Sequence, residues 1–230
     1  MIAIIPARGG SKGLPKKNIK LLNGIPLICH TIKTALESKS IHRVIVSTDD
    51  EEIAKISKNC GADVPFMRPI SLAMDDSMVM DTYFHVIDKI REETKSQIDS
   101  FVALLPTVPL RLADDIDNAV KIFKSYNADS VISVVKAPVP IEWHRKITNK
   151  GILENYLPEF NATRNRQEFK EAYVPNGSIY VFRVEPLRSK REYYNKKTYP
   201  YIMPSERSVD IDYSSDFEWA EFLLKKKLNE

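Results

Sequence analysis

Short runs of apolar residues alternate along the chain with longer segments in which apolar residues recur every three or four positions. The short runs predict strands and the longer segments predict amphipathic helices. The predicted strands are residues 2–5, 44–46, 101–105, 130–135, 178–183 and 199–203. The predicted helices are residues 26–38, 50–59, 78–93, 113–125 and 216–226. Because the two kinds of element alternate, we expect an α/β fold whose central strands are parallel.

Residues 138–172 interrupt this alternation. Pro, Asn, Arg and aromatic residues follow one another there with no clear period, which predicts an inserted hairpin or loop region at an edge. The chain has 230 residues, which is enough for one domain with a full core but short for two. We therefore expect a single domain over residues 1–230 with an insertion at about 138–172.

Composition and charge exclude several classes of protein. Apolar residues make up 43% and charged residues 28%, as in an ordinary soluble globular protein. The net charge is only +3 and the cations are scattered, which argues against binding to nucleic acid. No apolar run approaches the roughly 20 residues of a membrane span, and residues 1–6 lack the basic start of an export signal. We expect a cytoplasmic protein.

The two cysteines, Cys29 and Cys60, have no zinc-site spacing and cannot build a disulfide framework. We expect two buried thiols in a reducing compartment.

A basic, glycine-rich segment follows the first predicted strand directly. It reads Ala7-Arg8-Gly9-Gly10-Ser11-Lys12-Gly13-Leu14-Pro15-Lys16-Lys17-Asn18. The glycines let the backbone approach a ligand closely, and the four cations can neutralise a triphosphate. The segment is neither a Walker A loop nor a dinucleotide fingerprint. A basic surface turn is the alternative interpretation, but open α/β sheets bind ligands at the carboxyl ends of their strands, which favours a phosphate loop.

Two aspartates near the C-terminus are separated by one residue, in Ser208-Val209-Asp210-Ile211-Asp212. In an extended segment this spacing places Asp210 and Asp212 on one face. Mg²⁺ takes one or two carboxylates together with phosphate oxygens and water, so the pair can hold the ion beside a triphosphate. The spacing alone also fits a polar strand end that caps the helix beginning near Asp216. The phosphate loop favours the metal site.

A third segment, Tyr173 to Tyr180, contains Asn176-Gly177, which predicts a turn leading into a strand. Arg166 precedes it and can hold a substrate carboxylate through two parallel hydrogen bonds. The residues alone do not distinguish this role from that of a solvated arginine.

Six ordered blocks of residues, spread nearly from end to end, form a more specific pattern than any single motif. They are Ile5–Arg8 with Ser11–Pro15 and Lys17-Asn18, then Val46–Asp49, Arg68-Pro69 with Leu72-Ala73, Pro106-Thr107 with Pro109–Arg111, Pro175–Gly177, and Ser208–Asp212. Together they resemble the bacterial CMP-sialic acid synthetases, or N-acylneuraminate cytidylyltransferases. The resemblance implies a Rossmann-like nucleotidyltransferase sheet flanked by helices. It also implies a homodimer in which the irregular middle region packs against the partner subunit.

The resemblance also implies roles for individual residues. Those implied to bind the nucleotide are Arg8, Gly10, Ser11, Lys12, Lys17, Asn18, Arg68 and Ser77, with Arg68 at the cytidine end. Those implied to face the sugar acid are Leu105, Arg166, Asn176 and Tyr180, with Tyr180 near the acyl pocket. Asp210 and Asp212 match the metal-linked carboxylates. The predicted catalytic set is Arg8, Lys12, Lys17, Asp210 and Asp212.

One position departs from the family: Leu105 stands where a glutamine is common. Leucine has no donor or acceptor, and a sugar hydroxyl left unpaired against it would cost about 1–3 kcal/mol. This favours either a deoxygenated relative of N-acetylneuraminate, such as legionaminate or pseudaminate, or a shifted pose of the sugar.

The predicted function is transfer of CMP from CTP to the anomeric hydroxyl of a nonulosonic acid, with Mg²⁺ and release of pyrophosphate. A cytidylyltransferase for the eight-carbon acid Kdo is the nearest alternative. A catalytically silent nucleotide-binding module is another, although it would not need a pair of carboxylates suited to a metal.

Overall fold

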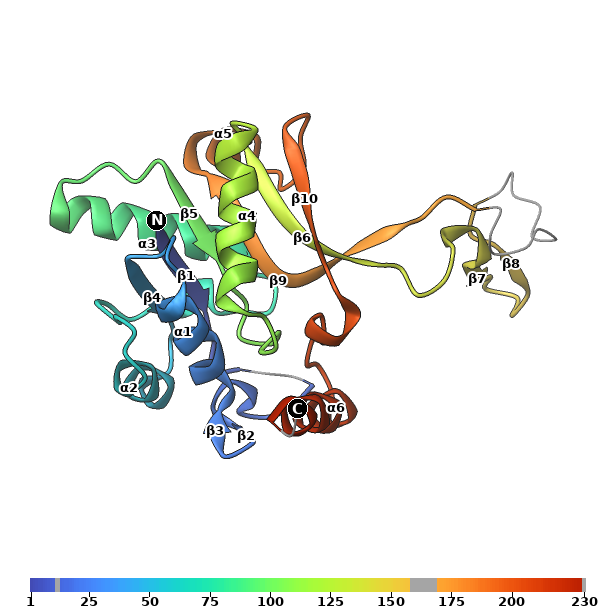
Figure 1. Ribbon diagram of the computed structural model, residues 1–230, viewed down its shortest axis with the longest axis horizontal. Coiled ribbons are helices and arrows are strands. Elements are labelled where there is room, and N and C mark those ends of the chain that lie inside the picture. The colour runs from blue at the N-terminus through green and yellow to red at the C-terminus, as the bar shows by residue number, and fades with distance from the viewer. Residues whose placement is uncertain (11–12, 158–168, 229–230) are drawn as a thin grey trace.

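A six-stranded sheet forms the centre of the molecule in the computed structural model, which describes residues 1–10, 13–157 and 169–228 (Figure 1). Its strands are β1 (Ile2–Pro6), β4 (Arg43–Ser47), β5 (Ser100–Ala103), β6 (Ser130–Lys136), β9 (Tyr173–Arg183) and β10 (Thr198–Met203). The helices are α1 (Leu27–Glu37), α2 (Glu51–Asn59), α3 (Val79–Thr94), α4 (Ala113–Ser125), α5 (Val184–Lys190) and α6 (Ser214–Leu228). Short hairpins join β2 (Leu21–Leu22) to β3 (Ile25–Pro26) and β7 (Arg145–Ile147) to β8 (Leu153–Asn155).

The α/β fold class is confirmed, and each predicted strand and helix is present. The strand order is β10-β6-β9-β5-β1-β4, with β1 parallel to both β4 and β5 as expected. Hydrophobic periodicity missed α5 and the hairpin of β2 and β3, because these elements are too short to show a period.

Strand β9 differs from the prediction in direction and in length. It runs antiparallel to both neighbours, β5 and β6, and begins at Tyr173. The predicted turn at Asn176-Gly177 is wrong, because these residues lie inside β9 at a register shift opposite Ile132 and Val134. Gly177 has a φ of 72°, a conformation that glycine adopts without steric cost. The Asn-Gly signal therefore marks a bulge in this chain.

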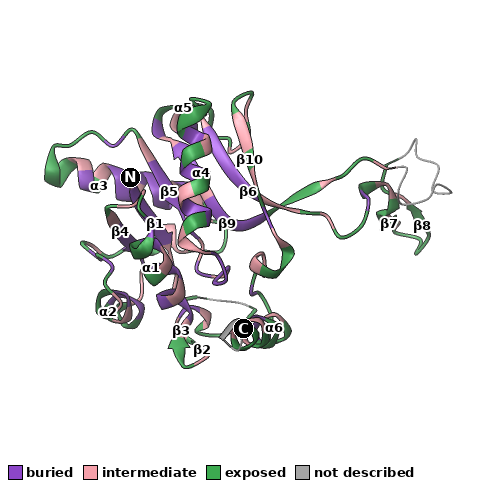
Figure 2. Cartoon of the chain, in the orientation of Figure 1, coloured by how far each residue is buried: buried purple, intermediate pink, exposed green. Residues whose placement is uncertain are grey.

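The strands of the sheet are largely buried (Figure 2). Their alternate side chains belong to two apolar clusters, one on each face of the sheet. On β1, Ala3 and Ile5 pack with residues of α1, α2 and α4, while Ile2 and Ile4 pack with residues of α3 and α5. Both faces are thus covered by helices, as a largely parallel sheet requires. A third, smaller cluster attaches α6 through Phe217 to the segment that follows β1.

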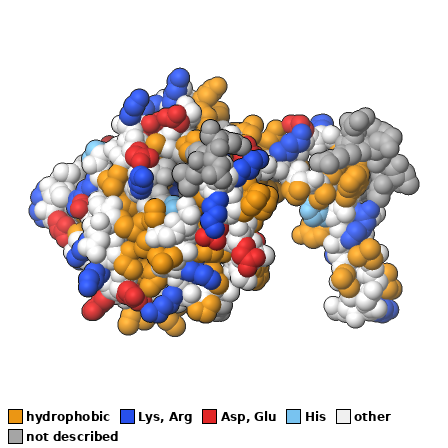
Figure 3. All heavy atoms as spheres, turned by 60° about the horizontal axis from the view of Figure 1, so that its bottom comes forward, with side chains coloured by type: hydrophobic (Ala, Val, Ile, Leu, Met, Phe, Trp, Pro, Cys, Tyr) orange, Lys and Arg blue, Asp and Glu red, His pale blue; other side chains and the backbone are white. Residues whose placement is uncertain are grey.

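The irregular region projects from the body of the molecule as an arm, residues 137–172, which leaves the sheet after β6 and returns into β9 (Figure 1). The arm carries the hairpin of β7 and β8. Large apolar side chains are exposed along it, including Trp143, Ile147 and Leu153 (Figure 3). The arm therefore presents an apolar surface that the body of the same chain does not cover.

None of the helices in the described part of the chain has the length and apolar character that crossing a membrane requires.

The two cysteines form a disulfide bond, so the prediction of two free buried thiols is wrong. Cys29 lies in the first turn of α1, and Cys60 is the C-cap residue of α2. The fold brings their Cα atoms to 5.7 Å, within the range that a disulfide spans. A separation of 31 residues gave no local signal for this pairing. The expectation of a reducing compartment loses the support of the cysteines.

We expect reduction of this disulfide to lower the free energy of unfolding by about 3–4 kcal/mol, because the bond closes a loop of the unfolded chain. Urea unfolding with and without dithiothreitol measures the difference. The double variant Cys29→Ala, Cys60→Ala is the control, because its unfolding should not respond to the reductant. Equal midpoints for the wild-type protein in both conditions would contradict a stabilising disulfide.

Candidate active site

The candidate site lies where β1, β4 and β5 end, since parallel strands present their carboxyl ends at one edge of the sheet. The phosphate loop, described at residues 7–10 and 13–18, leaves β1 there, and its first residues are held against the end of β4. The backbone N–H of Ala7 donates to the carbonyl of Ser47 at 2.9 Å, and that of Gly9 donates to Asp49 Oδ1 at 3.0 Å. A Cβ on Gly9 would lie 2.9 Å from Asp50 Oδ2, so this approach requires glycine.

A cavity of about 290 Å³ opens beside this loop. Its lining residues come from widely separated parts of the chain and are Pro6, Arg8, Gly13, Lys17, Asn18, Leu105, Pro106, Thr107 and Asp212. The structure thus brings together five of the residues predicted from the sequence: Arg8, Lys17, Asn18, Leu105 and Asp212.

Two polar side chains at the end of the loop, Lys17 and Asn18, hold it in place. Asn18 is buried and donates from Nδ2 to the carbonyl of Arg8 at 3.0 Å. Lys17 donates from Nζ to the carbonyl of Ile211 at 2.6 Å and forms an ion pair with Asp212 at 3.0 Å. Only 12% of the Lys17 side chain is exposed, so this cation is held at the cavity wall. Lys16 instead pairs with Glu52 of α2 and lies outside the cavity lining.

Arg8 joins the phosphate loop to the segment that precedes α3. Its NH1 donates to the carbonyl of Met74 at 3.2 Å and pairs with Asp75 at 3.1 Å. Ser77 lies on the same segment and donates from Oγ to the carbonyl of Ser71. A phosphate group binding to Arg8 would therefore compete with Asp75 for the guanidinium.

Arg68 is a buried arginine in the segment between α2 and α3, and it contacts the end of β4. Its Nε donates to Ser47 Oγ at 3.2 Å and its NH2 donates to the Ser47 carbonyl. Burial lowers the pKa of the Arg68 guanidinium to about 10, while the charge of Asp49 acts in the opposite direction. The side chain thus fixes the end of β4 beside the phosphate loop, and its predicted contact with cytidine stays a prediction.

The two aspartates are placed differently: Asp212 lines the cavity, whereas Asp210 is not among its lining residues. Asp210 forms a hydrogen bond with the side chain of Thr107, whose carbonyl accepts the Ile211 N–H at 2.8 Å. Burial raises the pKa of Asp210, and repulsion from Asp212 adds to the shift, although Thr107 and Lys17 oppose it. Two carboxylates are therefore held close together at an electrostatic cost.

This pair fits a Mg²⁺ ion in the chemistry of its donors. Mg²⁺ binds through one or two carboxylates and completes its coordination with phosphate oxygens and water. Within the described residues no group of three or more His, Cys, Asp or Glu side chains could hold a metal without a ligand. A metal at Asp210 and Asp212 would thus depend on oxygens from the nucleotide.

Of the residues predicted to face the sugar, Leu105 lines the cavity, whereas Tyr180 is absent from the lining and packs against a core cluster. The Cδ1 of Leu105 lies 3.4 Å from where a Cβ on Gly177 would stand. Tyr180 stacks on Phe182 with ring centroids 5.8 Å apart. Burial raises the pKa of Tyr180 to about 12, and the charges of Tyr194 and Asp210 add to this. Tyr180 is therefore a neutral phenol at physiological pH.

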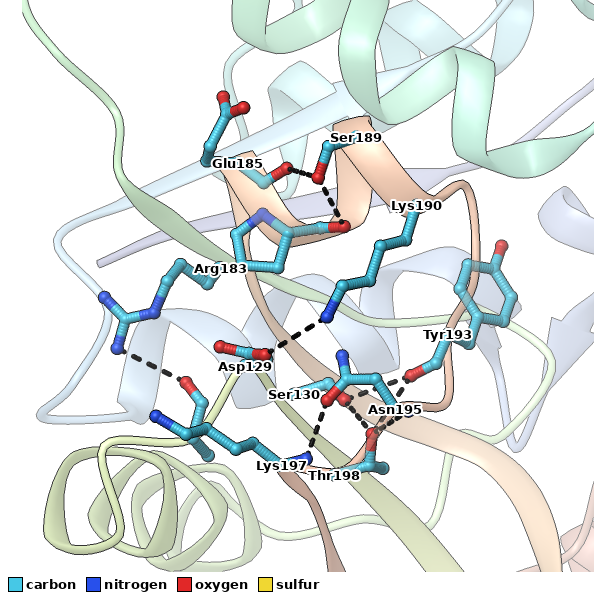
Figure 4. A network of polar contacts seen from close by, with 12 residues as sticks. Asp129, Ser130, Arg183, Glu185, Ser189, Lys190, Tyr193, Asn195, Lys197 and Thr198 are labelled. Atoms are coloured by element: carbon cyan, nitrogen blue, oxygen red, sulfur yellow. Dashed lines mark hydrogen bonds and ion pairs between the residues drawn. The ribbon is translucent and has the colours of Figure 1, made fainter.

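A polar network holds the loop that brings Tyr193 to these rings (Figure 4). Ser130 Oγ donates to the carbonyl of Tyr193 at 3.0 Å and lies 2.7 Å from Thr198 Oγ1. The Tyr193 ring lies 6.0 Å from Tyr180 and 5.3 Å from Phe182. The aromatic cluster of Tyr180, Phe182 and Tyr193 is thus anchored to β6.

Asn176 is buried, and its amide is already used inside the protein. It accepts from Ser133 Oγ at 2.6 Å and donates to Ser208 Oγ at 2.8 Å. These bonds tie β9 to β6 and to the segment before Asp210. A direct contact of Asn176 with a sugar stays a prediction.

Three predicted residues, Ser11, Lys12 and Arg166, lie outside the described residues. Gly10 is exposed and is absent from the cavity lining.

Sequence reasoning missed several residues that shape the site: Asp49, Asp75, Thr107 and Tyr193. Thr107 belongs to a block that matched the family, and that match was the available signal for it. Asp75 and Tyr193 act through contacts between distant segments, which no local pattern shows.

The sheet is covered by helices on both faces, and the family model that matches the chain identifies a nucleotidyltransferase. The family model for cytidylyltransferases matches residues 2–229, and the chain belongs to that family.

Curated relatives confirm the resemblance to the CMP-sialic acid synthetases. A CMP-N,N'-diacetyllegionaminic acid synthase of Legionella pneumophila is 37% identical over 98% of this chain and 96% of its own length. An N-acylneuraminate cytidylyltransferase of Escherichia coli O18:K1:H7 is 34% identical over 99% of this chain but 52% of its own length. The chain therefore spans about half the length of the E. coli relative.

Among solved structures, a CMP:2-keto-3-deoxy-manno-octonic acid synthetase complexed with CTP has a TM-score of 0.70 over 98% of both chains. Its identity to this chain is 17%, so the likeness shows the fold alone.

We expect Gly13→Ala to damage the site, because an added Cβ would lie 2.5 Å from the Asp212 carbonyl oxygen. The strain should lower the free energy of unfolding by about 1–3 kcal/mol. Thermal denaturation of Gly13→Ala and Gly10→Ala measures the difference. Gly10→Ala is the control, because nothing lies within 4 Å of its added Cβ. Equal melting temperatures for the two variants would contradict the close approach of the loop to Asp212.

We expect Asp210→Asn to raise the melting temperature near pH 7 and to lower kcat by about 10²–10³-fold. Because the pKa of Asp210 is raised above 3.8, its contribution to stability is present below that value and is lost as pH rises through the folded pKa. The neutral amide removes this cost, so its advantage should shrink on acidification towards pH 4. Asp99→Asn is the control, because Asp99 directly precedes β5, at the ends of the strands away from the site. A lower melting temperature for Asp210→Asn at pH 7 would contradict the electrostatic cost.

Proposed function

We propose that this protein transfers CMP from CTP to the anomeric hydroxyl of a sialic acid or a related nonulosonic acid and releases pyrophosphate. The observation that carries the proposal is the single cavity in which Arg8 and Lys17 face Leu105 and Asp212. The names of two relatives with nearly full coverage of this chain, a legionaminic acid synthase and a neuraminate cytidylyltransferase, agree with it.

The nucleotide end of the cavity supplies charge compensation. The proposal places the triphosphate against the phosphate loop, where Arg8 and Lys17 neutralise it and where glycines let backbone N–H groups approach. Arg8 would exchange its contact with Asp75 for a phosphate oxygen. The buried Arg68 is proposed to bind the cytidine end, and Ser77 is proposed to bind the nucleotide.

Asp210 and Asp212 are the residues proposed to hold Mg²⁺, which would supply positive charge to the phosphate oxygens. The chain's own part in this site is to hold both carboxylates in place. Thr107 fixes Asp210, and Lys17 fixes Asp212 through an ion pair at 3.0 Å.

The reaction itself is an in-line displacement. The anomeric hydroxyl oxygen of the sugar attacks the α-phosphorus of CTP and its proton passes to solvent, while the bond to the β-phosphate oxygen breaks and pyrophosphate leaves with the electron pair. Holding the two reactants in one cavity removes much of the entropic cost of their meeting. Arg166 is proposed to orient the sugar carboxylate through paired hydrogen bonds.

Leu105 favours a deoxygenated sugar of the legionaminate or pseudaminate type. Its apolar side chain lines the cavity and cannot pair with a hydroxyl. A sugar carbon that lacks a hydroxyl can pack against an apolar side chain, whereas a hydroxyl at that place would have no hydrogen-bond partner.

We also propose a homodimer in which the arm covers apolar surface of the partner. Ile147 is 75% exposed and Leu153 is 66% exposed, and large side chains exposed in this way along one element are typical of an interface. The enzyme is proposed to work in the cytoplasm, where CTP is available, and to supply activated sugars for cell-surface glycans.

Two alternatives are less well supported. A Kdo cytidylyltransferase rests only on a structural likeness at 17% identity. A silent nucleotide-binding module would not need Asp210 and Asp212 to be held together at an electrostatic cost.

The direct test is pyrophosphate release from CTP with a panel of nonulosonic acids and Kdo. We expect turnover with CTP and Mg²⁺, a preference for a nine-carbon acid, and loss of activity in EDTA. Restored activity on adding back Mg²⁺ is the control for chelation. Turnover with Kdo alone, or undiminished turnover in EDTA, would contradict the proposed substrate or the metal.

We expect Leu105→Gln to shift kcat/KM towards N-acetylneuraminate, relative to legionaminate, by about tenfold at most. A restored amide can pair with a hydroxyl, and one neutral hydrogen bond contributes about 1 kcal/mol. The melting temperature is measured beside both constants, with Leu105→Met as an apolar control. A lower melting temperature with an unchanged substrate ratio would show that Leu105 does not contact the sugar.

A further inference from the structure

Arg111 is a fully buried cation at the end of the segment that follows β5. Only 2% of the residue is exposed, and it is among the largest side chains in the interior. Its guanidinium reaches three separate parts of the fold. Nε donates to Ser178 Oγ on β9 at 3.0 Å, NH1 donates to Thr31 Oγ1 on α1 at 2.7 Å, and NH2 donates to the carbonyl of Leu105.

These three partners are neutral oxygens, and no carboxylate in the described part of the chain forms an ion pair with Arg111. Burial lowers the pKa of its guanidinium to about 9, although the charges of Asp115 and Asp210 oppose the shift. Asp115 is already paired with Arg207 at 2.8 Å. A buried charge of this kind is costly, and an apolar side chain of similar volume often stabilises a fold as well or better. Packing alone therefore does not account for an arginine here.

The hydrogen bond from Arg111 to Leu105 closes the segment 105–111 into a ring. Thr107 lies within this ring and contacts the carboxylate segment twice. Its carbonyl accepts the Ile211 N–H at 2.8 Å, and its side chain forms a hydrogen bond with Asp210. A Cβ on Gly177, next to Ser178, would lie 3.4 Å from both Asp210 Oδ2 and Leu105 Cδ1. A continuous chain of contacts thus runs from the guanidinium to the carboxylate pair.

We propose that Arg111 is a positioning residue, which fixes the 105–111 ring and thereby sets the place of Asp210 for the metal and of Leu105 for the sugar. The inference rests on the function proposed above. Arg111 itself does not line the cavity, so it acts through Thr107 and Leu105 and not by touching a substrate. Its positive charge also interacts favourably with the carboxylate of Asp210.

The alternative is a structural residue that only stabilises the fold, and the two roles predict different results. Replacing a purely structural residue lowers the melting temperature and leaves metal affinity unchanged. A positioning residue affects metal affinity beyond what the loss of stability explains, since groups that orient metal ligands typically contribute about 10–100-fold to affinity or activity.

The test compares Arg111→Met and Arg111→Lys with Phe123→Leu, a core substitution in α4 away from the cavity lining. The affinity for Mn²⁺, used as a probe for Mg²⁺, is measured by electron paramagnetic resonance with CTP present. The melting temperature and the affinity for CTP in EDTA are measured beside it.

For Arg111→Met we expect the Mn²⁺ dissociation constant to rise about tenfold, with CTP affinity in EDTA within about threefold of wild type. Arg111→Lys keeps the charge but reaches fewer of the three oxygens, so its effect should be intermediate. Phe123→Leu should lower the melting temperature and leave Mn²⁺ binding unchanged. If Arg111→Met does not fold, Thr31→Val and Arg111→Lys replace it, because each removes some of the three hydrogen bonds of the guanidinium.

Unchanged Mn²⁺ affinity in the folded Arg111 and Thr31 variants would overturn the positioning role and leave the proposed function intact. A wild-type protein that neither binds Mn²⁺ with CTP nor releases pyrophosphate would overturn the proposed function, and the role of Arg111 with it.

Discussion

The contact between the phosphate loop and the segment of the two aspartates is the constraint on which the site depends. Lys17 binds the Ile211 carbonyl at 2.6 Å and the Asp212 carboxylate at 3.0 Å. Gly13 lies so close to the Asp212 carbonyl that no side chain fits between them. Residues nearly two hundred positions apart are thereby pressed together. The cations proposed to bind a triphosphate, Arg8 and Lys17, consequently line one cavity together with Asp212, one of the two carboxylates proposed to bind a metal.

Charge is balanced unevenly around this contact. Lys17 neutralises Asp212. Among the residues that the structure describes, Asp210 has the hydrogen bond of Thr107 and the charge of Lys17 in its favour, but burial and the neighbouring carboxylates raise its pKa. Such local cost is typical of sites where a protein holds groups ready for a charged ligand. The buried Arg111 and its ring of neutral acceptors are part of the same arrangement, because they fix the segment that holds Asp210.

The sequence was sufficient for the layers of the fold, because strands such as β1 and helices such as α4 bury side chains with a clear period. It could not predict the direction of β9, since strand direction is set by the arm that joins it to β6. The phosphate loop and Asp212 were recognisable because each is local in sequence. The hydrogen bonds of Arg111 and the Cys29–Cys60 disulfide were not recognisable, because they join segments that are distant in sequence.

We propose that the loop of Arg8 and Lys17 and the carboxylates of Asp210 and Asp212 bind opposite sides of one triphosphate. A crystal structure with Mg²⁺ and a non-hydrolysable CTP analogue tests this most directly. We expect density for the triphosphate between Lys17 and Asp210, with a cation in contact with both carboxylates. A nucleotide bound elsewhere, or a triphosphate at the loop with Asp210 and Asp212 turned away from it, would contradict this arrangement.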